Sequence, residues 1–137
     1  MACRPKALVA CCECGNRQML VNLIARCGLH PVVATSTRDV VSKLGGESVC
    51  VAFCQDDLPG DGYKAVLKAA EQYAVPVVIC SRLADTERYL ESMQLGAFDF
   101  ICSPYHSPEV SALALSTLRR FPPQTATSSP KSLRMAL

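Results

Sequence analysis

Short β-prone runs alternate five times with segments of helical periodicity along this 137-residue chain. Each run is largely apolar, and each following segment carries apolar residues three or four positions apart, the spacing of one helix face. The expected strands are Ala7–Cys11, Pro31–Thr35, Val49–Cys54, Val75–Cys80 and Phe98–Cys102. Strict alternation of strand and helix predicts a doubly wound α/β fold, in which helices cover both faces of a five-stranded parallel sheet.

Glycines and charges mark where the intervening helices end. Gly28 and Gly96 follow two of the helical segments, at positions where glycine commonly ends a helix. The last helical segment ends near Arg120, whose charge suits the negative end of the helix dipole. Residues 121–137 are rich in proline, serine and threonine, which predicts a flexible tail. We therefore expect one domain over residues 1–120, followed by that tail.

Composition narrows the possible partners and the compartment. Half of the residues are hydrophobic and 19% are charged, which is typical of a globular domain and not of a disordered chain. A net charge of +2 gives no indication of nucleic-acid binding. No apolar run approaches the roughly 18–20 residues that cross a membrane. We therefore expect a cytoplasmic protein with neither a nucleic-acid nor a membrane partner.

The ligand crevice of a doubly wound sheet lies beyond the carboxyl ends of its strands. The side chains that follow each strand are therefore the candidates for a functional site. Four short stretches occupy that edge: Cys11-Cys12-Glu13, Gln55-Asp56, Ser81 and Ser103.

Motifs at these strand ends, taken together and in order, resemble the receiver domain of bacterial response regulators over roughly residues 6–120. Gly96-Ala97-Phe98-Asp99-Phe100 is similar to the family's Gly-Ala-x-Asp-Tyr. Leu58-Pro59 matches a Met or Leu followed by Pro, and Ser103-Pro104-Tyr105 stands where the family has Lys-Pro-Phe. The resemblance implies a flavodoxin-like (βα)5 sheet with strand order 2-1-3-4-5. It also implies a cis peptide before Pro104, a bond type largely confined to proline.

Most of the residues that carry the family's chemistry are different in this chain. Counted back from Leu58-Pro59, the position of the phosphorylated aspartate holds Gln55. The two acids that hold a divalent cation in the family correspond to Cys11 and Cys12, followed by Glu13. The same correspondence gives three further positions: Ser81 for the family's Ser or Thr, Phe100 for its switch aromatic, and Ser103 for its lysine.

These departures remove the family's usual chemistry. An acyl phosphate forms on an ionised carboxylate, whereas Gln55 is a neutral amide. Phosphoryl transfer also uses a hard cation held by oxygen ligands, whereas Cys11 and Cys12 offer soft sulfur. The sequence therefore predicts a degenerate receiver that serves phosphorelay signalling through phosphorylation-independent contacts between proteins. We expect no cofactor and no enzymatic activity.

A displaced acceptor remains open as an alternative. Asp56 or Asp57 could accept phosphate in place of Gln55, with Glu13 helping to hold a cation. The favoured interpretation is that both aspartates are solvated acids in a turn, where aspartate is common. Phosphoryl transfer depends on closely positioned groups, and a shifted acceptor would have to recover that geometry.

A thiol site is the second alternative. Cys11, Cys12 and Cys14 contain a C-x-x-C pattern between a strand and the start of a helix, where a thiol can have a lowered pKa. The three residues could form a redox or soft-metal sensing module. The favoured interpretation of the nine cysteines is that most are reduced, buried structural thiols. Strand residues alternate between the faces of a sheet, so the strand thiols cannot all converge.

The resemblance also implies protein partners and a contact face. Receivers bind a histidine kinase, another receiver or an output protein, commonly through the fourth helix, the fifth strand and the fifth helix, and a homodimer is a further option. A set of aromatic and cationic residues suited to an interface falls near that face: Arg82, Arg88, Tyr89, Tyr105 and His106.

Overall fold

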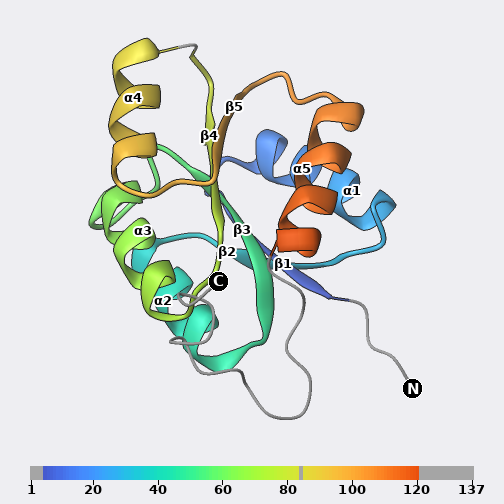
Figure 1. The fold of residues 1–137 in the computed structure, drawn as a ribbon, viewed down its shortest axis with the longest axis horizontal. Helices are drawn as coiled ribbons and strands as arrows, with labels where there is room; N and C mark the ends of the chain where they lie inside the picture. Colours follow the sequence, from blue (N-terminus) through green and yellow to red (C-terminus); the bar gives the residue numbers. More distant parts are fainter. Residues whose placement is uncertain (1–4, 84, 121–137) are drawn as a thin grey trace.

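The computed structural model describes residues 5–83 and 85–120, and within these ranges five strands alternate with five helices (Figure 1). The strands are β1 (Lys6–Ala10), β2 (His30–Ala34), β3 (Val49–Gln55), β4 (Val77–Ser81) and β5 (Asp99–Cys102). The helices are α1 (Cys14–Arg26), α2 (Thr37–Gly46), α3 (Gly62–Gln72), α4 (Thr86–Gln94) and α5 (Ser107–Arg120). The predicted alternation is confirmed, and residues 121–137, the predicted tail, lie outside the described ranges.

All neighbouring strands are parallel, and their order is β2-β1-β3-β4-β5. Helices α1 and α5 cover one face of the sheet, and α2, α3 and α4 cover the other (Figure 1). The predicted doubly wound fold and strand order are therefore confirmed. No helix of the described ranges is long and apolar enough to cross a membrane.

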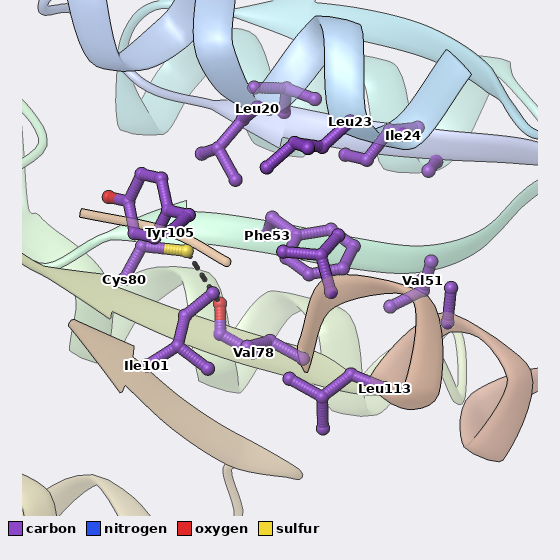
Figure 2. Packing of buried hydrophobic residues seen from close by; sticks show 14 of the residues in the cluster. Leu20, Leu23, Ile24, Val51, Phe53, Val78, Cys80, Ile101, Tyr105 and Leu113 are labelled. Atoms are coloured by element: carbon purple, nitrogen blue, oxygen red, sulfur yellow. Dashed lines mark hydrogen bonds between the residues drawn. The ribbon is translucent and has the colours of Figure 1, made fainter. Parts of the chain in front are cut away.

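The core has two layers, one on each face of the sheet, because successive strand residues point to opposite faces. Val51 and Phe53 of β3 pack toward α1 and α5, whereas Ala52 and Cys54 pack toward α2 and α3. Figure 2 shows the Phe53 ring in the first layer, with side chains of α1 on one side and those of β4 and α5 on the other. The central strand is thus covered on both faces, as its continuous apolar sequence indicates.

The observed element ends agree with the sequence signals, with small shifts. Gly28 and Gly96 have φ values of 87° and 102°, the left-handed region that suits glycine at a helix end. The peptide before Pro104 is cis, as the resemblance implies. Strand β3 runs one residue further than predicted, to Gln55, because Gln55 pairs with Cys80 of β4. That extension places the Gln55 side chain at the carboxyl edge of the sheet.

The turn after β3 is fixed against the start of α2. The backbone N–H of Thr37 donates to the Pro59 carbonyl at 3.0 Å, and its hydroxyl donates to the same oxygen at 3.3 Å. Gly60 adopts a φ of 109°, and a Cβ there would meet the Thr37 Cβ at 3.1 Å. Glycine is therefore required both by the backbone angle and by the close approach. This contact holds the loop that carries Asp56 and Asp57.

Candidate functional site

The carboxyl ends of four strands meet at one edge of the sheet. Gln55 ends β3 and Ser81 ends β4, while Cys11 follows β1 and Ser103 follows β5. The Ser103 N–H donates to the Ser81 carbonyl at 2.8 Å, which links the two segments directly. The residues expected at this edge therefore lie together in the structure.

Gln55 is buried, with 5% of its surface exposed, and its amide bonds the loop after β1. Its Oε1 accepts a hydrogen bond from the Cys12 backbone N–H at 3.0 Å and lies 3.6 Å from the Cys12 Sγ, which also donates to it. Every buried side-chain nitrogen or oxygen in the described ranges has a hydrogen-bond partner. The Gln55 amide oxygen thus connects β3 to the loop after β1.

The thiols at this edge do not form one cluster. Cys11 is buried, its Sγ donates to the Glu13 carbonyl at 3.6 Å, and burial raises the pKa of its thiol. Cys12 is exposed. Cys80 packs on the same face of the sheet as Cys11, but Cys54 packs on the opposite face. In the described parts of the chain, no three metal-ligating side chains are grouped so that they could hold a metal ion.

The Cys14 side chain of the C-x-x-C alternative lies outside the described part of the structure. The seven cysteines whose state is described are all free thiols, from Cys11 to Cys102. Burial raises the pKa of Cys54 and Cys80 well above the ordinary thiol value. These two thiols behave as buried apolar groups, as the burial preference of free cysteine predicts.

Arg82, directly after β4, bridges carboxylates from two other loops. Its Nη1 lies 2.8 Å from the Glu13 Oε2, and its Nη2 lies 3.2 Å from the Asp57 Oδ2. Glu13 follows β1 and Asp57 follows β3, so one guanidinium joins three loops at this edge. Both contacts are charge-assisted hydrogen bonds, the stronger class of such bonds.

Arg88, on the first turns of α4, binds the remaining aspartate. Its Nη1 lies 3.0 Å from the Asp56 Oδ2, and only 12% of the Asp56 side chain is exposed. The guanidinium also lies over the Tyr63 ring, 5.7 Å from its centroid. Although burial opposes its charged form, the hydrogen bond and charge of Asp56 raise the pKa of Arg88. Asp56 and Asp57 do lie in a turn, as expected, and Asp57 is exposed. The expectation that Asp56 is solvated is wrong, because Arg88 covers its carboxylate.

Helix α4 contacts the domain through both apolar and polar side chains. Ser92 is buried, and Met93 is partly buried against the core layer of α2 and α3. The Tyr63 hydroxyl of α3 donates to the Glu91 carboxylate, and the Lys64 Nζ lies 3.1 Å from the same carboxylate. Burial and the bonded Glu91 raise the pKa of Tyr63 to about 12. Arg88 and Glu91 thus add polar contacts to the apolar packing of α4.

The other predicted positions have separate local roles. The Ser81 hydroxyl is buried and accepts a hydrogen bond from the Leu83 N–H at 3.1 Å. The Ser103 hydroxyl lies 3.5 Å from the Asn16 Oδ1. Phe100 is half-buried and meets the Tyr89 ring edge-on, with centroids 5.8 Å apart. A shallow hollow lies beside this aromatic pair, lined by Asp85, Thr86, Tyr89, Phe100 and Cys102.

Sequence reasoning placed Arg82 and Arg88 on an interaction face and missed their bonds to the loop acids. The sequence indicates their position but not their partners, since Arg82 directly follows β4 and Arg88 lies on the helix after it. Tyr105 was grouped with the same face, and this is wrong, because Tyr105 is buried in the core layer of α1 and α5 (Figure 2). Tyr89, by contrast, is 41% exposed.

The divalent cation that the resemblance implies does not fit the residues present. Hard cations take oxygen ligands, but the thiols of Cys11 and Cys12 occupy the positions of the family's acids. The Gln55 amide oxygen already accepts the Cys12 N–H, and the Glu13 carboxylate is bonded to Arg82. The described side chains thus satisfy one another without a metal ion.

Cys12 and Cys54 should differ sharply in their reaction with iodoacetamide. Cys12 is exposed, whereas Cys54 is fully buried and its pKa is raised, first by burial and then by the charge of Asp56. Because the thiolate is the reacting form, we expect native alkylation at Cys12 and protection of Cys54 until the chain unfolds. Peptide mapping after brief labelling, with a denatured sample as the control, measures both. Equal native labelling of the two thiols would contradict this packing.

Comparison with known proteins gives distant relatives in sequence. No family model matches the chain. It is 24% identical over 118 residues to the "Probable transcriptional regulator ycf27" of Guillardia theta, and 25% identical over 118 residues to the protein of that name in Porphyridium aerugineum. Each alignment covers 85% of this chain, but 46% and 49% of the relatives. The chain therefore spans about half the length of the curated relatives it matches.

Solved structures of low sequence identity have a similar backbone fold. The receiver domain of NtrX from Brucella abortus has a TM-score of 0.77 at 21% identity, over 83% of this chain and 98% of that one. A two-component response regulator from Clostridium difficile has a TM-score of 0.78 at 20% identity, over 87% and 99% of the two chains. The chemotaxis response regulator CheY4 of Vibrio cholerae has 0.75 at 18% identity, over 85% and 100%. This chain therefore has the fold of response-regulator receiver domains.

Proposed function

We propose that this chain is a degenerate receiver module that serves phosphorelay signalling by binding other proteins, without a phosphoryl switch at Gln55. The observation that carries the proposal is the bonded state of Gln55. Its amide oxygen accepts the Cys12 N–H at 3.0 Å inside a buried site. An amide in this position is not an ionised nucleophile and cannot form an acyl phosphate.

The surrounding groups support the same conclusion. Aspartyl phosphorylation needs a carboxylate and a cation that offsets the charge of the phosphoryl oxygens. The carboxylates nearest to Gln55 along the chain, Asp56 and Asp57, are each bonded to an arginine, at 3.0 Å and 3.2 Å. A carboxylate that is already paired, and in the case of Asp56 largely buried, is poorly placed for in-line attack. Displaced phosphorylation of Asp56 is therefore one outcome of the test below and not the favoured function.

Exposed apolar side chains near α4 support protein binding as the mode of action. Leu83 is 72% exposed, and Tyr89 and Leu90 of α4 are also exposed. Aromatic and apolar side chains on one surface are common in interfaces. We propose that the α4–β5–α5 face receives a histidine kinase, another receiver or an output protein. We place the module in the cytoplasm because its described cysteines are free thiols, which reducing compartments maintain.

Intact-protein mass spectrometry after incubation with acetyl phosphate and Mg²⁺ tests the proposal. The wild-type chain and an Asp56→Asn variant are compared, each with and without reductant. We expect no phosphoryl adduct on either protein under any of these conditions. A Mg²⁺-dependent adduct that the Asp56→Asn variant loses would contradict the proposal and identify Asp56 as the acceptor. A mass change that depends only on reductant would instead favour thiol sensing.

A further inference from the structure

Acids from two loops at the carboxyl edge of the sheet meet two arginines that follow β4. Glu13 follows β1, and Asp56 and Asp57 follow β3. Arg82 and Arg88 both follow β4 and reach back to these acids, at N···O distances between 2.8 and 3.2 Å. The acids therefore meet guanidinium groups of the same chain.

Arg82 differs from Arg88 because it binds two acids at once. Its two terminal nitrogens each contact a different carboxylate, that of Glu13 at 2.8 Å and that of Asp57 at 3.2 Å. Two carboxylates brought to one guanidinium would repel each other if the cation were removed. The planar guanidinium can satisfy both, since it has several N–H donors in fixed directions. A divalent cation, which takes carboxylate oxygens as ligands, would join two acids from separate loops in a comparable way.

We propose that Arg82 is a built-in counter-cation that takes the place of a divalent metal ion at this edge and joins the β1–α1, β3–α3 and β4–α4 loops. The mismatch between the ligand set and a hard cation supports this assignment. The positions expected to supply metal-binding oxygens hold the thiols of Cys11 and Cys12, while the acids that remain, Glu13 and Asp57, are bonded to Arg82. The inference does not depend on the signalling role of the chain, because it concerns contacts within the domain.

Thermal unfolding with and without MgCl2 or MnCl2 tests the assignment in three proteins: the wild type, Arg82→Gln and the double variant Arg82→Gln/Glu13→Gln. We expect the wild-type melting temperature to be insensitive to either metal. The Arg82→Gln variant should melt earlier without metal, because Glu13 and Asp57 lose their counter-cation. It should then gain at least about 2 °C on addition of millimolar Mn²⁺, since a ligand that binds only the folded state stabilises it. The double variant should lose that gain, because one of the two carboxylates is gone.

Arg26→Gln is the matched control, because Arg26 is an exposed arginine at the end of α1, which lies at the opposite edge of the sheet. It should leave both the melting temperature and the metal response unchanged. Line broadening of amide signals by Mn²⁺ locates any bound metal and provides a readout independent of stability. In Arg82→Gln we expect broadening at Glu13 and Asp57, with none at these residues in the wild type.

Two results would overturn the assignment. Saturable wild-type broadening at Glu13 and Asp57 would mean that a metal site coexists with Arg82. An Arg82→Gln protein that keeps the wild-type melting temperature and ignores both metals would mean that the guanidinium is not a counter-cation. This experiment does not measure phosphoryl transfer. Failure of the counter-cation assignment is therefore distinguishable from failure of the proposed function.

Discussion

Replacing Phe53 with alanine is expected to lower the free energy of unfolding by about 3–5 kcal/mol, the usual range for a buried phenylalanine. Phe53 is fully buried in the central strand and contacts the layer formed with α1 and α5. The neighbouring strands β1 and β4 pair with both edges of β3, so the backbone cannot collapse readily into the space left behind. Chemical denaturation monitored by circular dichroism measures the change.

Leu115→Ala is the matched control for this substitution. Leu115 is a large apolar residue of α5 that is 53% exposed, so its truncation should change the free energy of unfolding by no more than about 0.5 kcal/mol. A Phe53→Ala loss below about 1.5 kcal/mol would be inconsistent with full burial of the ring. The contrast between the two variants separates loss of core packing from loss of apolar surface in general.

Replacing Arg88 with methionine is expected to cost about 1–3 kcal/mol, because it leaves the Asp56 carboxylate largely buried without its partner. Only 12% of the Asp56 side chain is exposed, and the Arg88 Nη1 lies 3.0 Å from it. In a double-mutant cycle with Asp56→Asn, we expect a coupling energy of about 1 kcal/mol or more. Hydrogen exchange should also accelerate in α4, because the substitution removes the contact between this helix and the loop after β3.

The Lys43–Asp39 pair on α2 provides the control cycle. The Lys43 Nζ lies 3.9 Å from the Asp39 Oδ1, and both side chains are partly exposed. Their coupling energy should therefore be about 0.3–0.5 kcal/mol, as in other exposed helix pairs. If the Arg88–Asp56 coupling is no larger than that of the control, the ion pair does not hold α4 in place. If the Arg88–Asp56 coupling energy is as large as expected but hydrogen exchange in α4 is unchanged, Arg88 stabilises only the loop after β3.

Most of the fold could be predicted from the sequence because the signals are local. Apolar runs and helical spacing identify each element, and glycines such as Gly28 and Gly96 end helices where their φ values are positive. The end of β3 was missed by one residue, because Gln55 joins the strand through pairing with Cys80, a contact between distant segments. Alternation of strand residues predicted that the strand thiols cannot all converge, and Cys54 does lie on the opposite face from Cys11 and Cys80.

The edge of the sheet at which a site would lie could also be predicted, but the bonds within it could not. Position follows from the strand ends, since parallel strands bring their carboxyl ends to one edge. Bonding depends on partners far apart in the chain: Arg82 is 69 residues from Glu13, and Arg88 is 32 residues from Asp56. No periodicity connects such residues. Both arginines were therefore assigned to the exterior, although they neutralise the acids of the site.

The most direct test of the central claim is an amide chemical-shift titration of the ¹⁵N-labelled chain with Mg²⁺ and beryllofluoride, an analogue of a bound phosphoryl group. The account predicts no shift of the Cys12, Gln55 or Ser81 signals, because the Gln55 oxygen is bonded to Cys12 and the nearby acids are bonded to arginines. Saturable, Mg²⁺-dependent shifts at these residues, spreading to α4, would contradict it and show that the site still accepts a phosphoryl group.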